Sequence, residues 1–220
     1  MTVKLDHILL GAADLVAGSA AFAAATGVTP ATGGTHPGFG TRNRLAALGP
    51  DCFFEVIATD PAQDPAQASA SMARARMIAA LPAPALLTFA IQTTDMDGLI
   101  TRALAAGLTA GALVPMNRTR PDGVRLDWTV THFAHPAYGE VIPFAIDWQG
   151  SPHPSLTSPD GCTLRSLTVL HPQAAGLAEI YRAIGLDVSV RAAVQPGFVA
   201  ILDTPNGEVY FLGTGAHAMG

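Results

Sequence analysis

The alternation of apolar and polar residues follows the same plan three times along the chain. Each time, a short apolar run leads through a polar or proline break into a segment with helical spacing, which ends in glycine and an aliphatic residue. A short apolar run predicts a strand, and apolar residues three and four positions apart predict an amphipathic helix. The three stretches are Leu5–Val28, Leu86–Leu108 and Leu164–Leu186.

The ends of the predicted helices carry the residue types that helix termini favour. Asp14 and Asp95 stand at the N-cap positions of the first two helices, and Pro172 suits the first position of the third. A glycine follows each helix where a left-handed C-cap residue belongs. These glycines are Gly27, Gly107 and Gly185.

Strand-like runs, rather than a second helix, follow each predicted helix. They read RNRLAALG and CFFEVIA after the first helix, GVRLDWTVTHF and EVIPFAIDW after the second, and DVSVRAAV, GFVAILDT and EVYFLG after the third. One helix followed by several strands does not fit a doubly wound parallel sheet, in which helices and strands alternate. The pattern predicts an α+β fold of repeated βαβββ modules with a cupped, mixed or antiparallel sheet.

We expect three modules along the chain. The first covers residues 1–60, the second residues 83–150, and a similar C-terminal module residues 160–214. Residues 61–82 are rich in proline and alanine, and we interpret them as a linker with a helix that begins near Ser71.

Composition argues against several classes of partner. The chain has 220 residues, of which 49% are hydrophobic, and its 12 basic and 17 acidic residues give a net charge of −5. A groove for nucleic acid or an anionic membrane surface would need clustered Lys and Arg. No apolar run approaches the roughly 18 residues of a membrane span, and we identify no signal peptide. We therefore expect no nucleic-acid or membrane partner and a cytoplasmic location, with Cys52 and Cys162 as buried thiols.

Four motifs, in order, resemble a known family. LDHILLGAADL, GGTHPGFGTRNRLAALG, FFEVIATDP and PFAIDW are similar to the glyoxalase-like domain family of the vicinal oxygen chelate superfamily, which includes glyoxalases, extradiol dioxygenases and drug-sequestering resistance proteins. The resemblance covers residues 5 to 150 by motif, and extends to residue 212 by the repeat. It implies a cupped sheet around a cavity. It leaves the reaction open, because this scaffold hosts several chemistries and some pure binders.

A histidine and a carboxylate are predicted to point from two strands to one side. Period-two alternation puts His7 on a face with Leu5 and Leu9, and Glu55 on a face with Phe53. A carboxylate among bulky apolar residues is costly to bury unless it is paired, hydrogen-bonded or bound to a metal.

By the resemblance, His7 and Glu55 match metal-ligand positions, and such a pair suits one divalent ion of Zn, Fe, Mn or Ni. The positions equivalent to His7 in the other modules hold Thr88 and Ser166, and those equivalent to Glu55 are apolar. His132, on the inward face of its strand, would complete a set of two histidines and one carboxylate. The alternative is a metal-free pair in which Glu55 is a general base oriented by His7.

The glycine-rich stretch GGTHPGFGTRN is not a nucleotide loop, because it lacks the lysine of a P-loop and the spacing of a dinucleotide fingerprint. We therefore expect no nucleotide cofactor. Gly38 and Gly40 are predicted to turn the chain into a strand from Thr41. The resemblance implies that this loop overhangs the cavity, and the alternative is that Asn43 caps backbone groups in the turn. The candidate substrate contacts here are His36, Thr41 and Asn43.

Further candidate ligand contacts lie in the second module. Arginine is suited to bidentate carboxylate binding, and tryptophan to lining an apolar pocket. The alternatives are solvated arginines and tryptophans that pack in the core. These candidates are Arg118, Arg120, Trp128 and Trp148. The remaining histidines resemble loop residues with no partner: His135, His153, His171 and His217.

The leading function is a glyoxalase-like small-molecule enzyme, of lyase or isomerase type or a dioxygenase-type metalloenzyme. The rival is a non-catalytic protein that binds or sequesters a small molecule, as resistance proteins of this superfamily do. A third reading is a structural or regulatory module with a vestigial pocket. Because half-open sheets have strand edges that need cover, we expect a homodimer.

Overall fold

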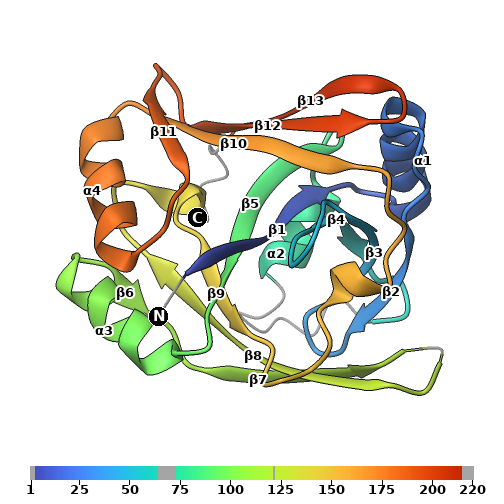
Figure 1. Ribbon diagram of the computed structural model, residues 1–220, viewed down its shortest axis with the longest axis horizontal. Helices are drawn as coiled ribbons and strands as arrows, with labels where there is room; N and C mark the ends of the chain where they lie inside the picture. The colour runs from blue at the N-terminus through green and yellow to red at the C-terminus, as the bar shows by residue number, and fades with distance from the viewer. Residues whose placement is uncertain (1–2, 64–72, 121, 215–220) are drawn as a thin grey trace.

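A computed structural model describes residues 3–63, 73–120 and 122–214, which form two sheets with helices beside them (Figure 1). In these ranges no helix is long and apolar enough to cross a membrane. The elements are β1 (Lys4–Gly11), α1 (Leu15–Thr26), β2 (Ala31–His36), β3 (Thr41–Ala47), β4 (Phe53–Thr59), α2 (Ala73–Ala79), β5 (Ala85–Gln92), α3 (Met96–Ala105), β6 (Thr109–Ala110), β7 (Val114–Thr119), β8 (Arg125–Ala134), η2 (Gly139–Val141), β9 (Phe144–Asp147), η3 (Pro154–Leu156), β10 (Thr163–His171), α4 (Ala174–Ile184), β11 (Ser189–Ala192), β12 (Gly197–Thr204) and β13 (Gly207–Thr214).

The first two modules share one large curved sheet. Its strand order is β2-β3-β4-β1-β5-β9-β8-β6, and β7 also pairs with β8. In each module the first strand pairs in parallel with the last, as β1 does with β4 and β5 with β9. The antiparallel pair β1–β5 joins the two halves. This is the predicted α+β fold with a cupped mixed sheet.

The third module repeats the order of elements but not their pairing. Its sheet has the order β11-β10-β12-β13, so its first strand pairs in parallel with the strand after the helix, β11, and not with the last strand, β13. It forms a separate four-stranded layer that does not join the cupped sheet. Figure 1 shows this layer crossing over β5, with α1 at one end and α4 at the other.

Aromatic side chains hold this layer against the back of the cupped sheet. Phe211 of β13 lies 4.8 Å from Phe54 of β4 and 5.5 Å from Phe22 of α1, measured between ring centroids. Phe89 of β5 contacts Tyr181 of α4 edge-on, and burial raises the pKa of this phenol. Its hydroxyl donates to the Val141 carbonyl at 2.5 Å. Both faces of the central strands are thus covered, which explains their continuous apolar sequence.

The helix ends follow the sequence in most places. Asp14 accepts from the Ala17 amide at 2.7 Å and Asp95 from the Gly98 amide at 3.0 Å, while Gly27 and Gly185 adopt left-handed conformations. Gly107 is also left-handed, one residue after the C-cap Ala106.

Two helix starts differ from the prediction. The third-module helix begins at Ala174 with Gln173 as its N-cap, so Pro172 lies in the turn before it. The linker contains the helix Ala73–Ala79, and the expected start at Ser71 lies outside the described residues.

Two strands form where the sequence analysis placed loops. The glycine-rich stretch is the β2–β3 hairpin, with Gly38 and Gly40 left-handed in its turn. β7 pairs along β8, although no strand was predicted there. Conversely, only Phe144–Asp147 of EVIPFAIDW is a strand, because residues 139–141 form a 3₁₀ turn and Pro143 offers no amide hydrogen for a ladder.

The crossing of β13 over β5 depends on Gly213. A Cβ at this position would collide with the carbonyl oxygen of Leu86. This oxygen belongs to the backbone of β5, so it cannot move away unless the strand shifts. We predict that Gly213→Ala lowers the free energy of unfolding by roughly 1–3 kcal/mol, the usual cost of overpacking. Urea unfolding measures this, and Val194→Ala, at a residue that is 87% exposed, serves as the control. Equal stability of the two variants would contradict the close approach.

Candidate functional site

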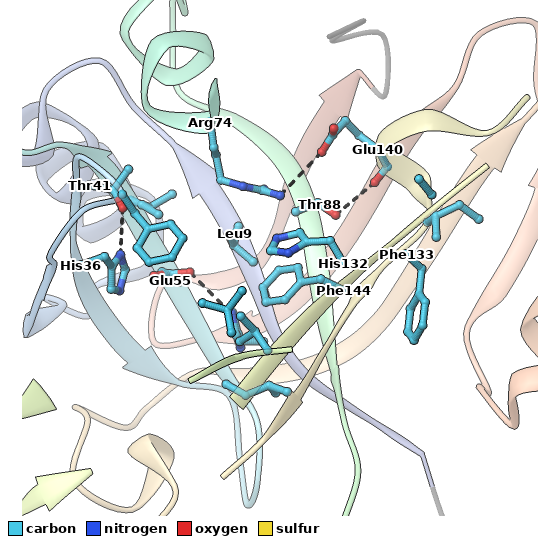
Figure 2. Close-up of a pocket in the computed structure, with 18 of the residues that line it drawn as sticks. Leu9, His36, Thr41, Glu55, Arg74, Thr88, His132, Phe133, Glu140 and Phe144 are labelled. Atoms are coloured by element: carbon cyan, nitrogen blue, oxygen red, sulfur yellow. Dashed lines mark hydrogen bonds and ion pairs between the residues drawn. The ribbon is translucent and has the colours of Figure 1, made fainter. Parts of the chain in front are cut away.

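A cavity of about 890 Å³ occupies the concave face of the cupped sheet (Figure 2). Strands β1, β3 and β4 form one side of it, and β7, β8 and β9 form the other. Most of its wall is apolar, with polar groups in a few places. All but one of the sequence-predicted site residues line it: His7, His36, Thr41, Asn43, Glu55, Arg118, Trp128, His132 and Trp148.

A bulge in β1 brings two adjacent polar residues into the site. The pairing of β1 with β5 shifts between Leu5 and His7, so Asp6 has no partner in the ladder. His7 and Leu9 face the cavity as predicted, whereas Leu5 packs against the core behind the sheet. Simple alternation fails at Leu5 because a bulge inserts one residue and reverses the face. Asp6 is consequently directed toward Trp148 and His153.

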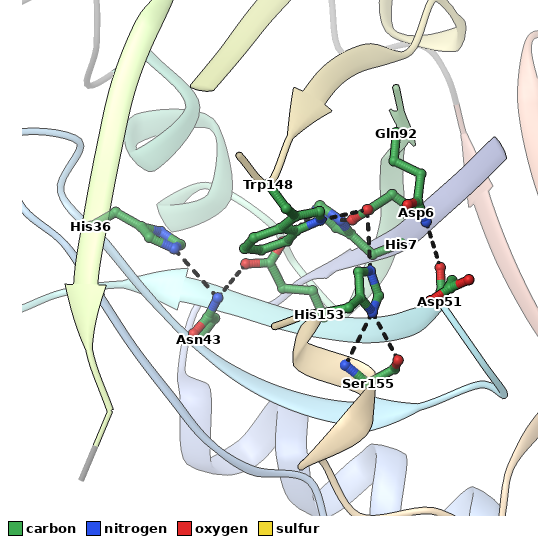
Figure 3. A network of polar contacts seen from close by, with 10 residues as sticks. Asp6, His7, His36, Asn43, Asp51, Gln92, Trp148, His153 and Ser155 are labelled. Atoms are coloured by element: carbon green, nitrogen blue, oxygen red, sulfur yellow. Dashed lines mark hydrogen bonds and ion pairs between the residues drawn. The ribbon is translucent and has the colours of Figure 1, made fainter. Parts of the chain in front are cut away.

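Asp6 is fully buried and accepts three hydrogen bonds from side chains (Figure 3). One oxygen contacts His7 Nδ1, and the other accepts from Trp148 Nε1 at 2.8 Å and lies 3.2 Å from His153 Nε2. Burial by itself raises the pKa of Asp6, but the hydrogen bonds and charges of His153 and His7 outweigh it, so the pKa lies below the ordinary value. Asp6 is therefore a carboxylate at neutral pH.

The Asp6 carboxylate determines which nitrogen of His7 carries a proton and which one faces Glu55. Since a carboxylate only accepts, His7 must hold a proton on Nδ1. The other nitrogen, Nε2, then faces Glu55 Oε2 at 3.5 Å. The ring stacks on Phe53 at 4.4 Å, which fixes its plane. Asp6, His7 and Glu55 thus form a chain in which His7 Nε2 faces the Glu55 carboxylate.

Glu55 is held from its other side by the β2–β3 hairpin. Asn43 Nδ2 donates to Glu55 Oε1 at 2.5 Å and lies 3.4 Å from His36 Nε2, and His36 Nδ1 is 2.8 Å from the Thr41 hydroxyl. Asn43 therefore positions Glu55 rather than capping the turn. Gly33 permits this, because a Cβ there would collide with Asn43 Oδ1.

The same chain of contacts fixes the state of His36. Burial lowers the pKa of His36, and Arg118 and His7 add to that effect against the opposite pull of Glu55 and Asp60. A neutral His36 can accept from Asn43 and donate to Thr41, which matches the contacts.

The residues present do not form a complete metal site. His7 Nε2 and Glu55 Oε2 converge, and Asp6 supports His7 as carboxylates behind metal-bound histidines do. However, no three His, Cys, Asp or Glu side chains of the described ranges are grouped so that they could hold an ion. His132 does not join the pair, because the Phe144 ring contacts both histidines, at 5.5 Å from His7 and 5.2 Å from His132. The three-ligand set expected from the sequence is therefore not assembled.

The two predicted arginines differ in their surroundings. Arg118 lies in the cavity wall, whereas Arg120 borders a smaller hollow and forms an ion pair with Asp122. Arg120 is therefore the one predicted contact that the structure leaves outside the cavity. Burial lowers the pKa of Arg118, and Arg120 adds to this while Glu55 opposes it.

The two tryptophans both line the cavity and lie 5.5 Å apart. Trp128 is 6% exposed and belongs to an apolar cluster with Val130 and Ile146, so it serves both the core and the cavity. Trp148 additionally donates to Asp6.

A second polar group, not foreseen from the sequence, lies across the cavity. Arg74 of α2 is 4.0 Å from the Glu140 carboxylate and 5.7 Å from the centre of the Phe144 ring. Thr88, at the position equivalent to His7, donates to the Glu140 carbonyl at 3.0 Å. Figure 2 shows these groups near His132. Burial lowers the pKa of His132, and the positive charge of Arg74 lowers it further.

Three histidines that were expected to lie in loops without partners make contacts with other side chains. His153 is 8% exposed and contacts Asp6, while its Nδ1 accepts from the Ser155 amide at 3.3 Å. His171 is buried and reaches the cavity, with its ring 5.0 Å from that of Tyr138, which also packs on His135. The contacts of His153 with Asp6 and of His171 with Tyr138 join distant parts of the chain, whereas His135 packs on a residue three positions along. His217 lies outside the described residues.

Neither cysteine is suited to nucleophilic chemistry. Both thiols are free, and burial raises the pKa of Cys52 to about 12 and also raises that of Cys162. A thiol is reactive as the thiolate, which burial disfavours here.

Sequence reasoning missed Asp6 and Arg74. Asp6 carried a usable signal, because a charged residue inside the apolar run KLDHILLG must find partners if the strand is buried. Arg74 carried none, since its segment shows only a short alanine-rich helix and its contact with Glu140 joins distant parts of the chain.

The fold and cavity define a class: an α+β protein with a small-molecule cavity in a cupped sheet built from two βαβββ modules. The model of the glyoxalase-like domain family matches residues 5–185. The chain therefore belongs to the glyoxalase-like domain family.

Several solved structures are similar to the chain at low sequence identity, and one of them supports the fold. A hypothetical protein from Staphylococcus aureus has a TM-score of 0.67 and 15% identity, with 97% of this chain and 86% of that chain covered. Methylmalonyl-CoA epimerase from Mycobacterium tuberculosis has a TM-score of 0.43 and 20% identity over 69% of this chain and 89% of its own. A mutant of 4-hydroxymandelate synthase from Streptomyces coelicolor has a TM-score of 0.48 and 16% identity, with 97% of this chain and 63% of that chain covered. No curated protein matches the chain.

The charge on Asp6 makes a testable contribution to stability. In Asp6→Asn, one amide group would face the donors of Trp148, His153 or His7, so we predict a loss of roughly 1–3 kcal/mol at pH 7 in urea unfolding. The folded-state pKa of Asp6 lies below the ordinary value of 3.8, so its stabilisation is present above that pH and is lost as the pH falls through the folded-state pKa.

The difference between wild type and Asp6→Asn should accordingly shrink below about pH 4. Asp187→Asn, at an exposed carboxylate, should show neither effect. A difference that is constant with pH would show that the Asp6 charge is not what stabilises the fold.

Proposed function

We propose that this protein is a glyoxalase-like enzyme of the lyase or isomerase type, which removes and returns a proton next to a carbonyl group of a small molecule. Glu55 is the base, and His7 is its proton partner. The observation that carries the proposal is the chain Asp6–His7–Glu55 at the wall of a largely apolar cavity.

The charges of this chain support proton transfer. Asp6 stays ionised, because its pKa is low, and it stabilises positive charge on His7. Glu55 takes a proton from the substrate carbon and passes it to His7 Nε2 across the 3.5 Å separation. The imidazolium returns the proton through Glu55 to the substrate, so the protein ends in its initial state. Return to another position gives an isomerisation. In a lyase reaction the leaving group departs with its bonding electrons from the atom next to the carbanion and takes the proton from the His7 imidazolium, which also restores the protein.

Neighbouring residues support this role by holding Glu55 in place. Asn43 binds Oε1 and leaves Oε2 directed to His7. His36 and Thr41 orient Asn43 and line the cavity, so we assign them as substrate-facing residues together with Trp128 and Trp148. The two rings supply apolar surface against which a substrate can lie.

Deuterium exchange tests the proposal without knowledge of the full reaction. The protein is incubated in D₂O with a panel of small aldehydes, ketones and 2-oxo acids that carry acidic C–H bonds, and wash-in of deuterium is followed by NMR. We expect exchange with wild type and a loss of about a hundredfold or more with Glu55→Gln, because a positioned base contributes at least that factor. Arg125→Gln, at an exposed ion pair, is the control.

The same assay separates this step from metal chemistry. Exchange should survive treatment with a chelator, since the step uses only Glu55 and His7. Loss of exchange on chelation, restored by Zn²⁺, Mn²⁺, Fe²⁺ or Ni²⁺, would contradict the metal-free step and assign the chemistry to an ion held by these residues.

The second candidate is a binding protein without turnover. At the positions of the second module that correspond to His7 and Glu55, the cavity wall has Thr88 and apolar residues in place of further metal ligands. This lack of a second set of ligands favours a protein that only binds its ligand. Ligands that raise the melting temperature, combined with no exchange in any panel compound, would support this candidate over the enzyme.

We further propose a cytoplasmic homodimer that forms through the third module. The free thiols are compatible with a reducing compartment. Strand β13 is the edge of its sheet, and its outer face exposes Tyr210 at 56% and Leu212 at 64%. Val199 and Ile201 lie opposite them on β12 and continue this apolar face.

A substitution on this face tests the dimer. Leu212→Lys should convert the protein from dimer to monomer in light scattering coupled to size exclusion, because it places a charge in the proposed contact. Val16→Lys alters a residue of α1 that is 59% exposed and should leave the mass unchanged. A wild-type monomer at micromolar concentration would refute the proposal.

A further inference from the structure

Arg118 is a cation in the cavity wall whose charge no acidic side chain pairs. The two other arginines of this hairpin have partners, since Arg120 pairs with Asp122 and Arg125 with Asp127. Within residues 3–63, 73–120 and 122–214, Arg118 makes no hydrogen bond and no ion pair within 4.0 Å. A half-buried guanidinium without a partner is costly, and a ligand that pairs with it removes that cost.

Its side chain is placed to meet a ligand. The Arg118 side chain reaches across to β2, where a Cβ built on Gly34 would lie 3.2 Å from its Cδ and 3.4 Å from its Nη1. The charged groups that act on it are Glu55, which attracts it, and Arg120, which repels it. Glu55 is itself occupied by Asn43 and faced by His7. The guanidinium donors of Arg118 are thus left for another anion.

An apolar surface leads away from this cation. Val114 and Met116 line the cavity on the same face of β7 as Arg118. Across the hairpin, Met116 is opposite Trp128. The four steps along the strand from Arg118 to Val114 span roughly 13 Å. The wall therefore offers one cationic end and an apolar stretch of about that length.

The cation across the cavity is a weaker candidate for the same role. Arg74 Nη1 is buried without a hydrogen bond, but the Glu140 carboxylate at 4.0 Å and the Phe144 ring already balance part of its charge. One ligand anion is therefore expected at the Arg118 end.

We propose that the ligand of this cavity is a small organic acid whose carboxylate binds Arg118 and whose apolar body lies along Met116 and Trp128. A guanidinium can take a carboxylate through two parallel hydrogen bonds. The inference rests on the proposed function in that it names the substrate class of the same cavity. It brings the carboxylate end of the substrate close to Glu55, the proposed base.

Matched probes test this preference without turnover. The sequence has two tryptophans, and both line the cavity, so intrinsic fluorescence reports entry of a ligand. The probes are 3-phenylpropanoate and its neutral amide, 3-phenylpropanamide. We expect wild type to bind the carboxylate at least about tenfold more tightly, which corresponds to about 1.4 kcal/mol. Arg118→Gln should remove this preference, because the affinity for the carboxylate then falls toward that for the amide. Arg120→Gln, at the paired neighbour, should retain it.

Each other outcome counts against the proposal. Equal binding of acid and amide to wild type, a preference that persists in Arg118→Gln, or no fluorescence change with either probe would overturn it. Circular dichroism and cooperative thermal unfolding show that Arg118→Gln is folded.

The outcome is separable from that of the exchange experiment. A preference for acids in a protein that exchanges no panel compound would leave the inference standing and refute only the enzyme. Exchange confined to neutral carbonyl compounds, with no preference for acids, would refute only the inference.

Discussion

A single buried carboxylate organises the cavity of this protein. Asp6 has no contact with water, so its charge is tolerable only because His7, Trp148 and His153 direct N–H groups to it. The three partners come from β1, from the end of β9 and from the segment before η3. Through Asp6, the first strand is tied to the end of the second module, and the orientation of His7 toward Glu55 follows from the same bonds.

The third module explains how the cup can be both apolar and stable. A sheet with an apolar concave face around a cavity must bury its other face well, because the cavity side contributes fewer contacts. Here the layer of β10, β12 and β13 covers the back through Phe211 and Tyr181. Its reach to the cavity, through His171 and Pro196, also makes it part of the far wall. Stability and cavity shape therefore depend on the same module.

The local pattern of the sequence predicted many of the strands, the helices and several residues of the cavity wall. Alternation placed His7, Glu55 and His132 on inward faces, and capping residues located the helices, because strand period and cap chemistry act over a few residues. The resemblance in four motifs identified the family. The stretch GGTHPGFGTRN lines the cavity through His36, Thr41 and Asn43, but it is a hairpin and not a loop, and Gly33 makes room for Asn43 of the paired strand.

The sequence by itself therefore determined the α+β class, the repeated order of elements and the polar residues on inward faces. Only the tertiary structure decided which of them meet. The bulge at Asp6, the separation of His132 from His7 by Phe144 and the pairing of Arg120 but not Arg118 depend on strand register and on contacts between distant segments. These features arise from long-range packing and electrostatics, which neither propensity nor periodicity encodes.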